Sequence, residues 1–302
     1  ICGKPLLEHL LLSIKEVGIE EALLIVHYMK EQIAEYFGDG KEIKMRLSYA
    51  EQEGVLGTAN AVSLAKNFVG DEPFLLIYGD LVVHASEIKK VLEAFKEKDK
   101  PIMGVVPTEH PERYGVVEVD ESGKVLDVVE KPSKEEAPSN LANAGIYVLT
   151  DKIFPLLENV PKSERGEYEI TDALRSLARE EGMYVAQLDH DKWLDVGRPW
   201  DLFAATKIIL DFMEPSLDGF IEEGATLTGK VVVEKGAIVR SGAYIEGPCF
   251  IGSGSDIGPN CYIRPYTSIG RGVRIGNAVA VSYTHLRAHE TEADLVCRLL
   301  LE

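Results

Sequence analysis

An aliphatic residue recurs at every sixth position in the C-terminal part of the 302-residue sequence. A period of six fits neither an α-helix nor a simple strand, but it is typical of hexapeptide repeats, in which each repeat supplies a short strand and a bend. Small residues such as Ala243 and Ser255 stand two places before each aliphatic residue and leave room inside a triangular coil. We therefore predict a left-handed parallel β-helix of about three and a half coils over residues 216–281. The aliphatic positions are Ile221, Leu227, Val233, Val239, Ile245, Ile251, Ile257, Ile263, Ile269, Ile275 and Val281.

Residues 1–215 follow a different pattern, in which strand-like and helix-like segments alternate. Apolar runs at residues 22–26 and 74–78 predict buried strands, residues 43–47 predict another strand, and residues 30–37 and the segment from Thr58 predict helices. This alternation indicates right-handed βαβ units. Two period-two segments flanking residues 121–123 predict an inserted hairpin, and Pro215 would stop the last helix. We expect an α/β domain with a Rossmann-like, mostly parallel mixed sheet.

The charge and composition of the chain limit its partners. The formal net charge is −18, whereas a nucleic-acid backbone or an anionic membrane attracts clustered Lys and Arg, so we expect neither partner. No apolar run approaches the roughly 18 residues of a membrane span, and no signal peptide is recognisable. The four cysteines form no CxxC pair. We expect a cytoplasmic protein with plain thiols.

The repeat domain has two possible uses. Hexapeptide helices occur in acyltransferases and in purely structural domains, but no histidine lies between Trp193 and Tyr283 to act as a general base. We therefore favour a scaffold that assembles a homo-oligomer. Residues 282–302 do not share the composition of the repeat, and we exclude this non-native-looking tail from fold arguments, including the spacing of His285 and His289.

Two aspartates follow predicted strands of the first domain. Asp80 comes directly after the apolar run at residues 74–78, and Asp195 ends the short apolar stretch that begins at Trp193. Ligands of open α/β sheets bind beyond the carboxyl ends of the strands. Mg2+ prefers oxygen ligands and bridges phosphate groups rather than occupying an all-protein cage. We predict that Asp80 and Asp195 share one Mg2+ ion, although either residue alone is also common in turns and helix caps.

A series of short motifs, in a fixed order, extends this interpretation. The motifs are GKPLLEH (3–9), LGTANA (56–61), YGD (78–80), YGVVEVD (114–120), VVEKP (128–132), NAGIYVL (143–149), RGEYEITDA (165–173) and WLDVGRPWD (193–201). Each motif is weak alone. Together they resemble the sugar-1-phosphate nucleotidylyltransferases, of the glucose-1-phosphate thymidylyltransferase and UDP-N-acetylglucosamine pyrophosphorylase type with a C-terminal hexapeptide domain. The resemblance covers residues 3–281.

The resemblance implies a reaction in which a sugar-1-phosphate attacks the α-phosphorus of dTTP or UTP and releases pyrophosphate. Such a reaction depends on positioning and on charge neutralisation. The resemblance assigns catalysis to Asp80, Asp195 and Lys131, with Mg2+ on both aspartates, and base recognition to Gln52, Gly57 and Thr58. The sugar-phosphate site would contain Gly115, Glu130, Lys131, Asn143, Gly145, Tyr168 and Thr171.

The chain departs from the family pattern at its start. The family's glycine-rich loop, which cradles the triphosphate, would lie upstream of Ile1, so we expect the 302-residue chain to have little or no turnover. Two alternative functions stay open. One is a bifunctional enzyme that also acetylates glucosamine-1-phosphate, and the other is a non-catalytic paralogue that senses nucleotide-sugars. The residues do not decide between uridine and thymidine, or between glucose and N-acetylglucosamine.

Overall fold

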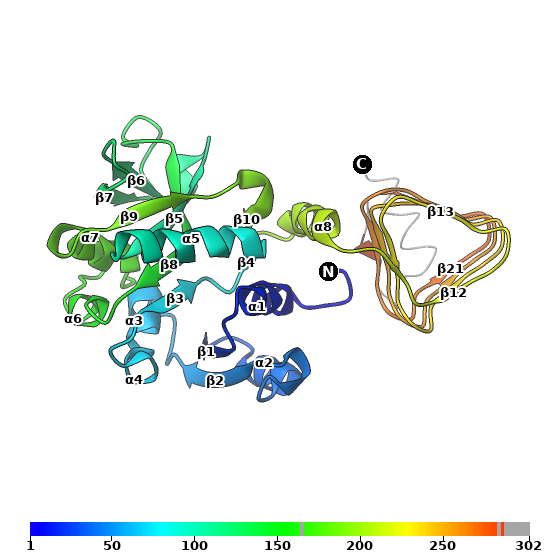
Figure 1. Cartoon of the computed structure of the whole chain (residues 1–302), viewed down its shortest axis with the longest axis horizontal. Helices are drawn as coiled ribbons and strands as arrows, with labels where there is room; N and C mark the ends of the chain where they lie inside the picture. Colours follow the sequence, from blue (N-terminus) through cyan, green and yellow to red (C-terminus); the bar gives the residue numbers. More distant parts are fainter. Residues whose placement is uncertain (164–165, 283–284, 287–302) are drawn as a thin grey trace. The chain divides into compact units, whose positions relative to one another are not determined.

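The computed structural model describes residues 1–163, 166–282 and 285–286 (Figure 1). The chain divides into a sheet unit, Leu10–Trp193, and a coil unit made of Ile1–His9 and Leu194–Glu302. Helix α1 (Leu6–Glu16) and strand β10 (Trp193–Asp195) each cross from one unit to the other. The domain limits expected from the sequence, at residues 215 and 281, stay predictions.

The sheet unit contains short strands connected by helices. Its strands are β1 (Glu21–Val26), β2 (Arg46–Glu51), β3 (Phe74–Ile77), β4 (Leu81–Val83), β5 (Ile102–Pro107), β6 (Gly115–Val119), β7 (Val125–Glu130), β8 (Leu141–Leu149) and β9 (Tyr184–Gln187). Its α-helices are α2 (Lys30–Phe37), α3 (Thr58–Ser63), α4 (Lys66–Val69), α5 (Ala85–Lys98), α6 (Ile153–Leu157) and α7 (Ile170–Glu180). The 3-10 turns are η1 (Lys41–Ile43), η2 (Pro111–Arg113) and η3 (His190–Lys192). None of the described helices is long and apolar enough to cross a membrane.

Strand β8 organises the main sheet. It runs antiparallel to β3, β5 and β6, while β9 joins β5 in parallel and β6 and β7 form an antiparallel hairpin. The strand order is β7-β6-β8-β5-β9, with β3 on β8, and β1 and β2 form a separate parallel pair. The expected α/β fold with a mixed sheet and the hairpin around residues 121–123 are confirmed. The expected mostly parallel direction does not hold in the main sheet. Among its described pairings only β5 with β9 is parallel, because β8 runs opposite to each of its three neighbours.

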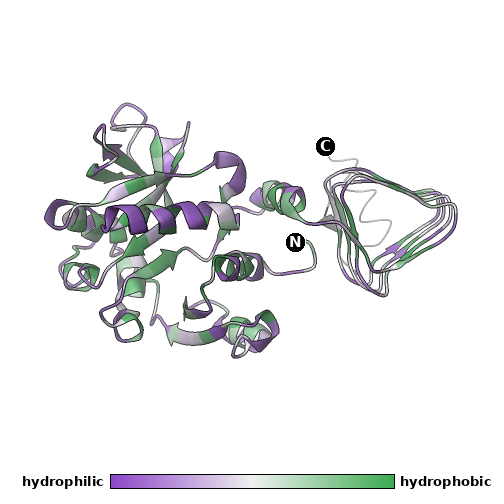
Figure 2. Ribbon diagram, viewed as in Figure 1, coloured by the Kyte–Doolittle hydropathy of each residue, from purple (hydrophilic) through white to green (hydrophobic). Residues whose placement is uncertain are grey.

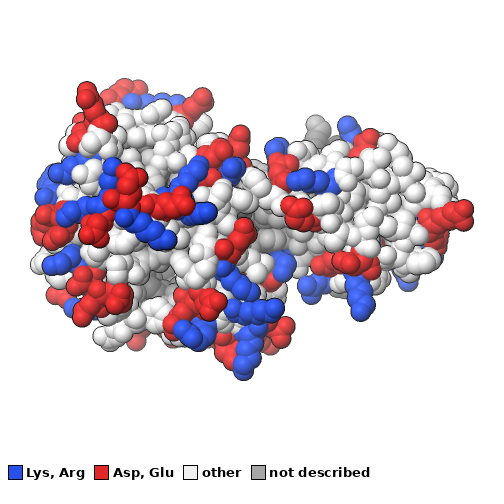
Figure 3. Space-filling model, in the orientation of Figure 1, with Lys and Arg blue, Asp and Glu red and all other residues white. Residues whose placement is uncertain are grey.

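Helices cover both faces of the main sheet. Met103 and Tyr147 point to the face where they pack with α3, α6 and α7 in one buried cluster. Successive strand residues point to opposite faces, and α5 packs against β5, β8 and β9 with its own buried Ile88 and Val91 outside that cluster. Figure 2 shows the outer face of α5 as hydrophilic, and Figure 3 shows acidic and basic side chains interspersed over it. This pattern is typical of a helix with one buried face.

The strand predicted at residues 43–47 starts later than expected. Ile43 belongs to η1, and β2 begins at Arg46. Gly40 and Lys44 both have positive φ, 84° and 55°, and the Gly40 carbonyl accepts hydrogen bonds from the Ile43 and Met45 amides. The first three residues of the predicted strand therefore belong to a tight turn, because their amides donate to carbonyls of the turn itself and not to β1. The apolar character of Ile43 reflects burial in the turn.

The coil unit contains helix α8 (Asp201–Phe212) and a β-helix of parallel strands, whose coils have the triangular outline seen in Figure 1. One side consists of β11 (Ser216–Leu217), β14 (Val231–Val233), β17 (Cys249–Ile251), β20 (Thr267–Ile269) and β23 (His285–Leu286). The second consists of β12 (Phe220–Ile221), β15 (Ile238–Val239), β18 (Asp256–Ile257) and β21 (Arg274–Ile275). The third consists of β13 (Thr226–Thr228), β16 (Tyr244–Glu246), β19 (Tyr262–Ile263) and β22 (Ala280–Val281). The predicted left-handed β-helix is confirmed.

The six-residue period is the spacing between the inward-pointing corners of a coil. Val233, Ile251 and Ile269 are aligned between neighbouring strands, eighteen residues apart, and each side chain has an exposed fraction of 0 %. The small residues two places earlier share the interior. Ser255 donates from Oγ to the Gly270 carbonyl at 2.8 Å and so satisfies its own hydroxyl inside the core. Stacked aliphatic side chains and paired backbone groups hold the coils together.

Strand β23 lies beyond Val281, where the predicted repeat ends. The backbone of β23 pairs in parallel with β20. In this pairing Ser268 is aligned with His285, which is seventeen residues later in the sequence. Between β17 and β20 the aligned residues, such as Cys249 and Thr267, are eighteen residues apart. The repeat therefore ends with a shortened step. The prediction of a non-native tail otherwise falls on residues 283–284 and 287–302, which lie outside the described residues.

The first prediction concerns the stacked core of the coils. Replacing Ile251 with alanine should lower the free energy of unfolding by about 2–4 kcal/mol, since the fully buried side chain leaves a cavity between Val233 and Ile269. The measurement is the urea midpoint followed by circular dichroism. Leu217→Ala is the control, because that side chain is 55 % exposed on the same side of the coil. Equal losses in the two variants would contradict the assignment of Ile251 to the core.

Candidate functional site

The loop before α3 is attached to the start of α7 by three hydrogen bonds. The Tyr168 amide donates to the Leu56 carbonyl at 2.9 Å, and the Ala59 amide donates to the Tyr168 carbonyl at 2.8 Å. Thr58 Oγ1 accepts from the Ile170 amide at 3.0 Å, so it pairs a donor at the start of α7 that has no partner within the helix. Two segments more than a hundred residues apart thus form one wall of the candidate site.

Gly57 is the point of closest approach in this wall. Its φ is 97°, and a Cβ atom there would lie 2.6 Å from the Tyr168 carbonyl oxygen. Only glycine combines that backbone conformation with that contact. Gln52 lies beside it, donating from Nε2 to the Gly57 carbonyl and to Asn60 Oδ1, each at 3.0 Å. The predicted base-recognition residues Gln52, Gly57 and Thr58 therefore lie together.

A second group of predicted residues meets at the start of the β6–β7 hairpin. Gly115 on β6 pairs with Glu130 on β7, and a Cβ on Gly115 would lie 3.2 Å from Glu130 Oε2 and 3.7 Å from the Cβ of Asn143. Thr171 on α7, 4 % exposed, donates from Oγ1 to Glu130 Oε2 at 2.8 Å. Four of the predicted sugar-phosphate residues thus contact one another. Tyr168 lies just before the first residue of α7 and three residues before Thr171, so the start of α7 joins this group to the Gln52 group.

The backbone of β8 is shaped where it passes this group. Asn143 Oδ1 accepts from the Gly145 amide at 3.1 Å, and Gly145 has φ 70°. A Cβ on Gly145 would lie 2.7 Å from the Tyr78 ring. The backbone amide of Tyr78 donates to the Gly145 carbonyl at 3.0 Å. The end of β3 can therefore lie directly against β8. Gly145 acts through this close packing, and Asn143 supplies the polar side chain.

Buried tyrosines and acidic groups surround the end of β3. Burial raises the pKa of Tyr78 to about 12, partly offset by the hydroxyl of Tyr147, with a further increase from the charges of Glu130, Glu169 and Asp80. The two phenol oxygens are 3.4 Å apart. Asp80 is exposed as a residue, but the protein around its carboxyl desolvates that group and raises its pKa. A hydrogen bond from its own backbone lowers the pKa in part. Three acidic side chains therefore act on the Tyr78 phenol at this edge of the sheet.

Sequence reasoning missed three of these residues. Tyr78, Tyr147 and Glu169 all stand inside motifs that were recognised, but no role was assigned to them. The signal available was a polar side chain inside an otherwise apolar strand, as in FLLIY and NAGIYVL. A buried phenol needs a partner, and that requirement points to other polar groups nearby.

Lys131 follows Glu130 at a backbone turn. Its φ is 46°, a left-handed conformation that is uncommon for lysine, and its amide donates to the Tyr114 carbonyl at 2.9 Å. The side chain is exposed. Backbone strain of this kind, held by neighbouring bonds, is frequent at functional sites.

The chain leaves the sheet unit next to the candidate site. Trp193 is buried, donates from Nε1 to the Ala144 carbonyl at 2.9 Å and contacts the Tyr114 ring edge-on. Trp193 is thereby fixed between β8 and the turn before Gly115. Asp195 follows two residues later but belongs to the coil unit. That Asp195 and Asp80 bind the same Mg2+ ion therefore stays a prediction.

A pair of glycines tests the contact at the wall. Gly54 and Gly57 both have positive φ, 92° and 97°, but a Cβ on Gly54 would meet no atom within 4 Å. Gly54→Ala should cost about 1 kcal/mol of unfolding free energy from its backbone conformation alone. Gly57→Ala should cost at least about 2 kcal/mol more, because the Tyr168 backbone must move. Urea unfolding measures both, and equal losses would contradict the described contact.

Comparison with known proteins assigns a family. The sequence model of the family described as "Nucleotidyl transferase" matches residues 1–211. The bifunctional protein GlmU of Methanococcus maripaludis (strain C7) is 40 % identical over 238 residues, covering 79 % of this chain and 55 % of that protein. The GlmU protein of Methanocaldococcus jannaschii is 43 % identical over 281 residues, 93 % of this chain and 65 % of that protein. The chain thus spans about half the length of the Methanococcus relatives.

Solved structures resemble about two thirds of the chain. A UDP-glucose pyrophosphorylase complexed with UDP-glucose is 27 % identical with a TM-score of 0.60, covering 67 % of this chain and 85 % of that one. A UDP-glucose pyrophosphorylase from Acinetobacter baumanii is 25 % identical with a TM-score of 0.59, covering 69 % and 82 %. The family match, the ordered motifs and the fold agree, and the chain belongs to the nucleotidyl transferase family.

Proposed function

We propose that this chain is part of an enzyme that transfers a nucleotidyl group from dTTP or UTP to a sugar-1-phosphate and releases pyrophosphate. The observation that carries the proposal is the contact set of Gly115, Glu130, Asn143 and Thr171. A carboxylate, an amide and a hydroxyl converge there beside a backbone without a side chain. Such a site can hydrogen-bond several sugar hydroxyls while letting the ring approach the main chain.

The proposed contacts of the sugar follow from which polar atoms are already occupied. Thr171 uses its hydroxyl hydrogen on Glu130 Oε2, so this bond holds the carboxylate in place. The carboxylate, which carries further lone pairs, then accepts from a sugar hydroxyl. Asn143 uses Oδ1 on the Gly145 amide, and its side chain also hydrogen-bonds the Tyr147 phenol. The Nδ2 group carries two hydrogens, so we assign the second one to a sugar hydroxyl. The wall formed by Gln52, Gly57 and Thr58 is the proposed base site, and Tyr168 connects the two.

The donor chemistry near Asp80 fits a magnesium ion. Desolvation raises the pKa of its carboxyl, and a bound divalent cation would favour the charged form. Among the described residues, no three His, Cys, Asp or Glu side chains form a cage, so the proposed ion depends on Asp80, Asp195 and substrate phosphate oxygens. When bound, Mg2+ would neutralise charge on the α-phosphate and the sugar phosphate. Lys131, exposed at its turn, is proposed to neutralise the sugar phosphate.

One alternative activity has support from the comparisons. Relatives are named bifunctional, including a sugar-1-phosphate nucleotidylyltransferase/acetyltransferase of Sulfurisphaera tokodaii that is 38 % identical over 238 residues. The β-helix is the proposed place for acetyl transfer, and transfer from acetyl-CoA to glucosamine-1-phosphate would discriminate this bifunctional form. A cytoplasmic homo-oligomer assembled through the β-helix also stays a proposal, as does the choice of base and sugar.

Binding of a nucleotide-sugar tests the proposed site directly. Glu130→Gln should weaken binding of UDP-glucose or dTDP-glucose about tenfold, since it removes the charge that accepts a sugar hydroxyl and holds Thr171. Isothermal titration calorimetry on the 302-residue chain gives the affinities. The matched control is Glu118→Gln, because Glu118 lies exposed on the same hairpin.

Each outcome of this experiment bears on the proposal. Unchanged binding by Glu118→Gln together with weakened binding by Glu130→Gln supports it. If neither nucleotide-sugar binds the folded chain, or if both variants bind like the unsubstituted protein, the assignment of Glu130 to a sugar site is wrong.

A further inference from the structure

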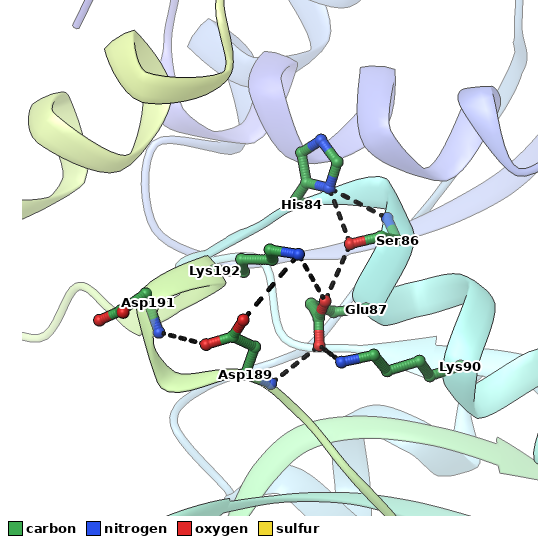
Figure 4. A network of polar contacts seen from close by, with 7 residues as sticks. All are labelled: His84, Ser86, Glu87, Lys90, Asp189, Asp191 and Lys192. Atoms are coloured by element: carbon green, nitrogen blue, oxygen red, sulfur yellow. Dashed lines mark hydrogen bonds and ion pairs between the residues drawn. The ribbon is translucent and has the colours of Figure 1, made fainter.

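A carboxylate is completely buried at the start of α5, outside the residues assigned above. The Glu87 side chain has an exposed fraction of 0 % and is one of few buried charged groups in the described part of the chain. Its Oε2 accepts from Lys90 Nζ at 2.6 Å and from the Asp189 amide at 2.8 Å. Its Oε1 accepts from Ser86 Oγ at 2.8 Å and lies 3.8 Å from Lys192 Nζ (Figure 4). Every oxygen of this carboxylate is therefore engaged.

The partners of Glu87 come from two segments a hundred residues apart. Ser86 and Lys90 lie on α5, which follows β4, whereas Asp189 and Lys192 lie around η3. A backbone bond supports the same junction, since the His84 amide donates to the Lys192 carbonyl at 3.0 Å. Asp189 Oδ1 also accepts from the Asp191 amide at 3.0 Å, which caps the turn. Figure 4 shows the side chains of both segments pointing toward one another.

The charges of this network balance. Glu87 and Asp189 carry two negative charges, and Lys90 and Lys192 carry two positive ones, with Lys192 Nζ 3.9 Å from Asp189 Oδ2. A buried carboxylate is costly unless it is paired and hydrogen-bonded. Apolar side chains could fill the same space without that cost. A buried ionic group in such a position is more informative about geometry than about stability.

The junction lies between the two aspartates along the chain. Asp80 precedes His84 by four residues through β4, and Asp195 follows Lys192 by three residues through the anchored Trp193. A change in the distance between α5 and η3 would therefore shift the two short segments, residues 80–84 and 192–195, that connect these elements to the aspartates. Hydrogen bonds that connect the two segments fix that distance.

We propose that Glu87 is a positioning residue for the paired aspartates. It holds η3 against the start of α5 and so fixes, within the sheet unit, the two backbone segments that lead to Asp80 and to Asp195. This inference rests on the proposed function, because it concerns the geometry of the proposed Mg2+ ligands. Groups that orient metal ligands from outside the ligand set commonly change metal affinity tenfold to a hundredfold.

The test compares Glu87→Gln with Glu93→Gln. Glutamine keeps the size of Glu87 and one acceptor oxygen but removes the charge and the second acceptor. Glu93 lies on the same helix, is exposed and makes only a 3.7 Å surface ion pair with Lys89 among the contacts of the described residues. Lys192→Met is a second variant, since it leaves the Glu87 bonds to Lys90 and to the Asp189 amide intact and removes only one charge.

Two readouts separate a positioning role from a purely structural one. Amide hydrogen exchange, read by mass spectrometry, reports whether η3 is released. Binding of Mn2+ in the presence of UDP-glucose, read by electron paramagnetic resonance, reports the proposed ion site without requiring turnover. UDP-glucose affinity without metal reports the sugar and base residues alone.

We expect Glu87→Gln to speed exchange across residues 189–192 and to weaken Mn2+ binding at least about tenfold, while metal-free UDP-glucose affinity stays within about twofold. Lys192→Met should weaken Mn2+ binding in the same direction by a smaller factor, and Glu93→Gln should change nothing. This second variant decides the question if Glu87→Gln does not fold.

Failure of this inference is distinguishable from failure of the proposed function. If Asp80→Asn abolishes Mn2+ binding but Glu87→Gln and Lys192→Met do not weaken it, the inference is wrong and the function stands. If exchange across residues 189–192 rises while Mn2+ affinity is unchanged, Glu87 is structural only, and the inference is again wrong. If the unsubstituted chain binds UDP-glucose but no Mn2+, the proposed ion site and the inference both fail.

Discussion

The close contact between the Gly145 backbone and the Tyr78 ring is the constraint on which the sheet unit depends. It requires a residue without a side chain at φ 70°, and it brings the end of β3 against β8. Asp80 lies three residues after the end of β3, and Asn143 lies on β8 two residues before Gly145. The contact therefore sets how near the proposed metal ligand lies to the proposed sugar site. A side chain at position 145 would force the two strands apart.

The remaining site residues are placed by long-range hydrogen bonds. Thr58 bonds to the start of α7, and Thr171 on that helix bonds to Glu130 on the hairpin. Helix α7 thus links the residues proposed to bind the base to those proposed to bind the sugar. An amide in its first turn donates to a hydroxyl from α3. Polar groups that are shared in this way lock a geometry more firmly than they raise stability. The residues proposed for the base and the sugar are consequently connected by hydrogen bonds within the sheet unit.

The β-helix was predictable from sequence because its determinants are local. A coil closes every eighteen residues, and each interior position is read from a side chain and its neighbour two places earlier, as with Ile251 and Cys249. The site residues were predictable only from ordered motifs, because no local pattern shows that Thr171 contacts Glu130. The turn at Gly40 and the Glu87 network were missed. Both depend on which backbone groups find partners, and for Glu87 the partner is an amide a hundred residues away.

The central claim is that Asp80 and Asp195 act on one divalent ion. The most direct measurement is a double-mutant cycle on Mn2+ affinity in the presence of a nucleotide-sugar, with Asp80→Asn, Asp195→Asn and both together. A shared ion predicts strong non-additivity, in which the double variant binds Mn2+ no more weakly than the poorer single variant. Additive losses, or a loss from only one of the two substitutions, would contradict the claim.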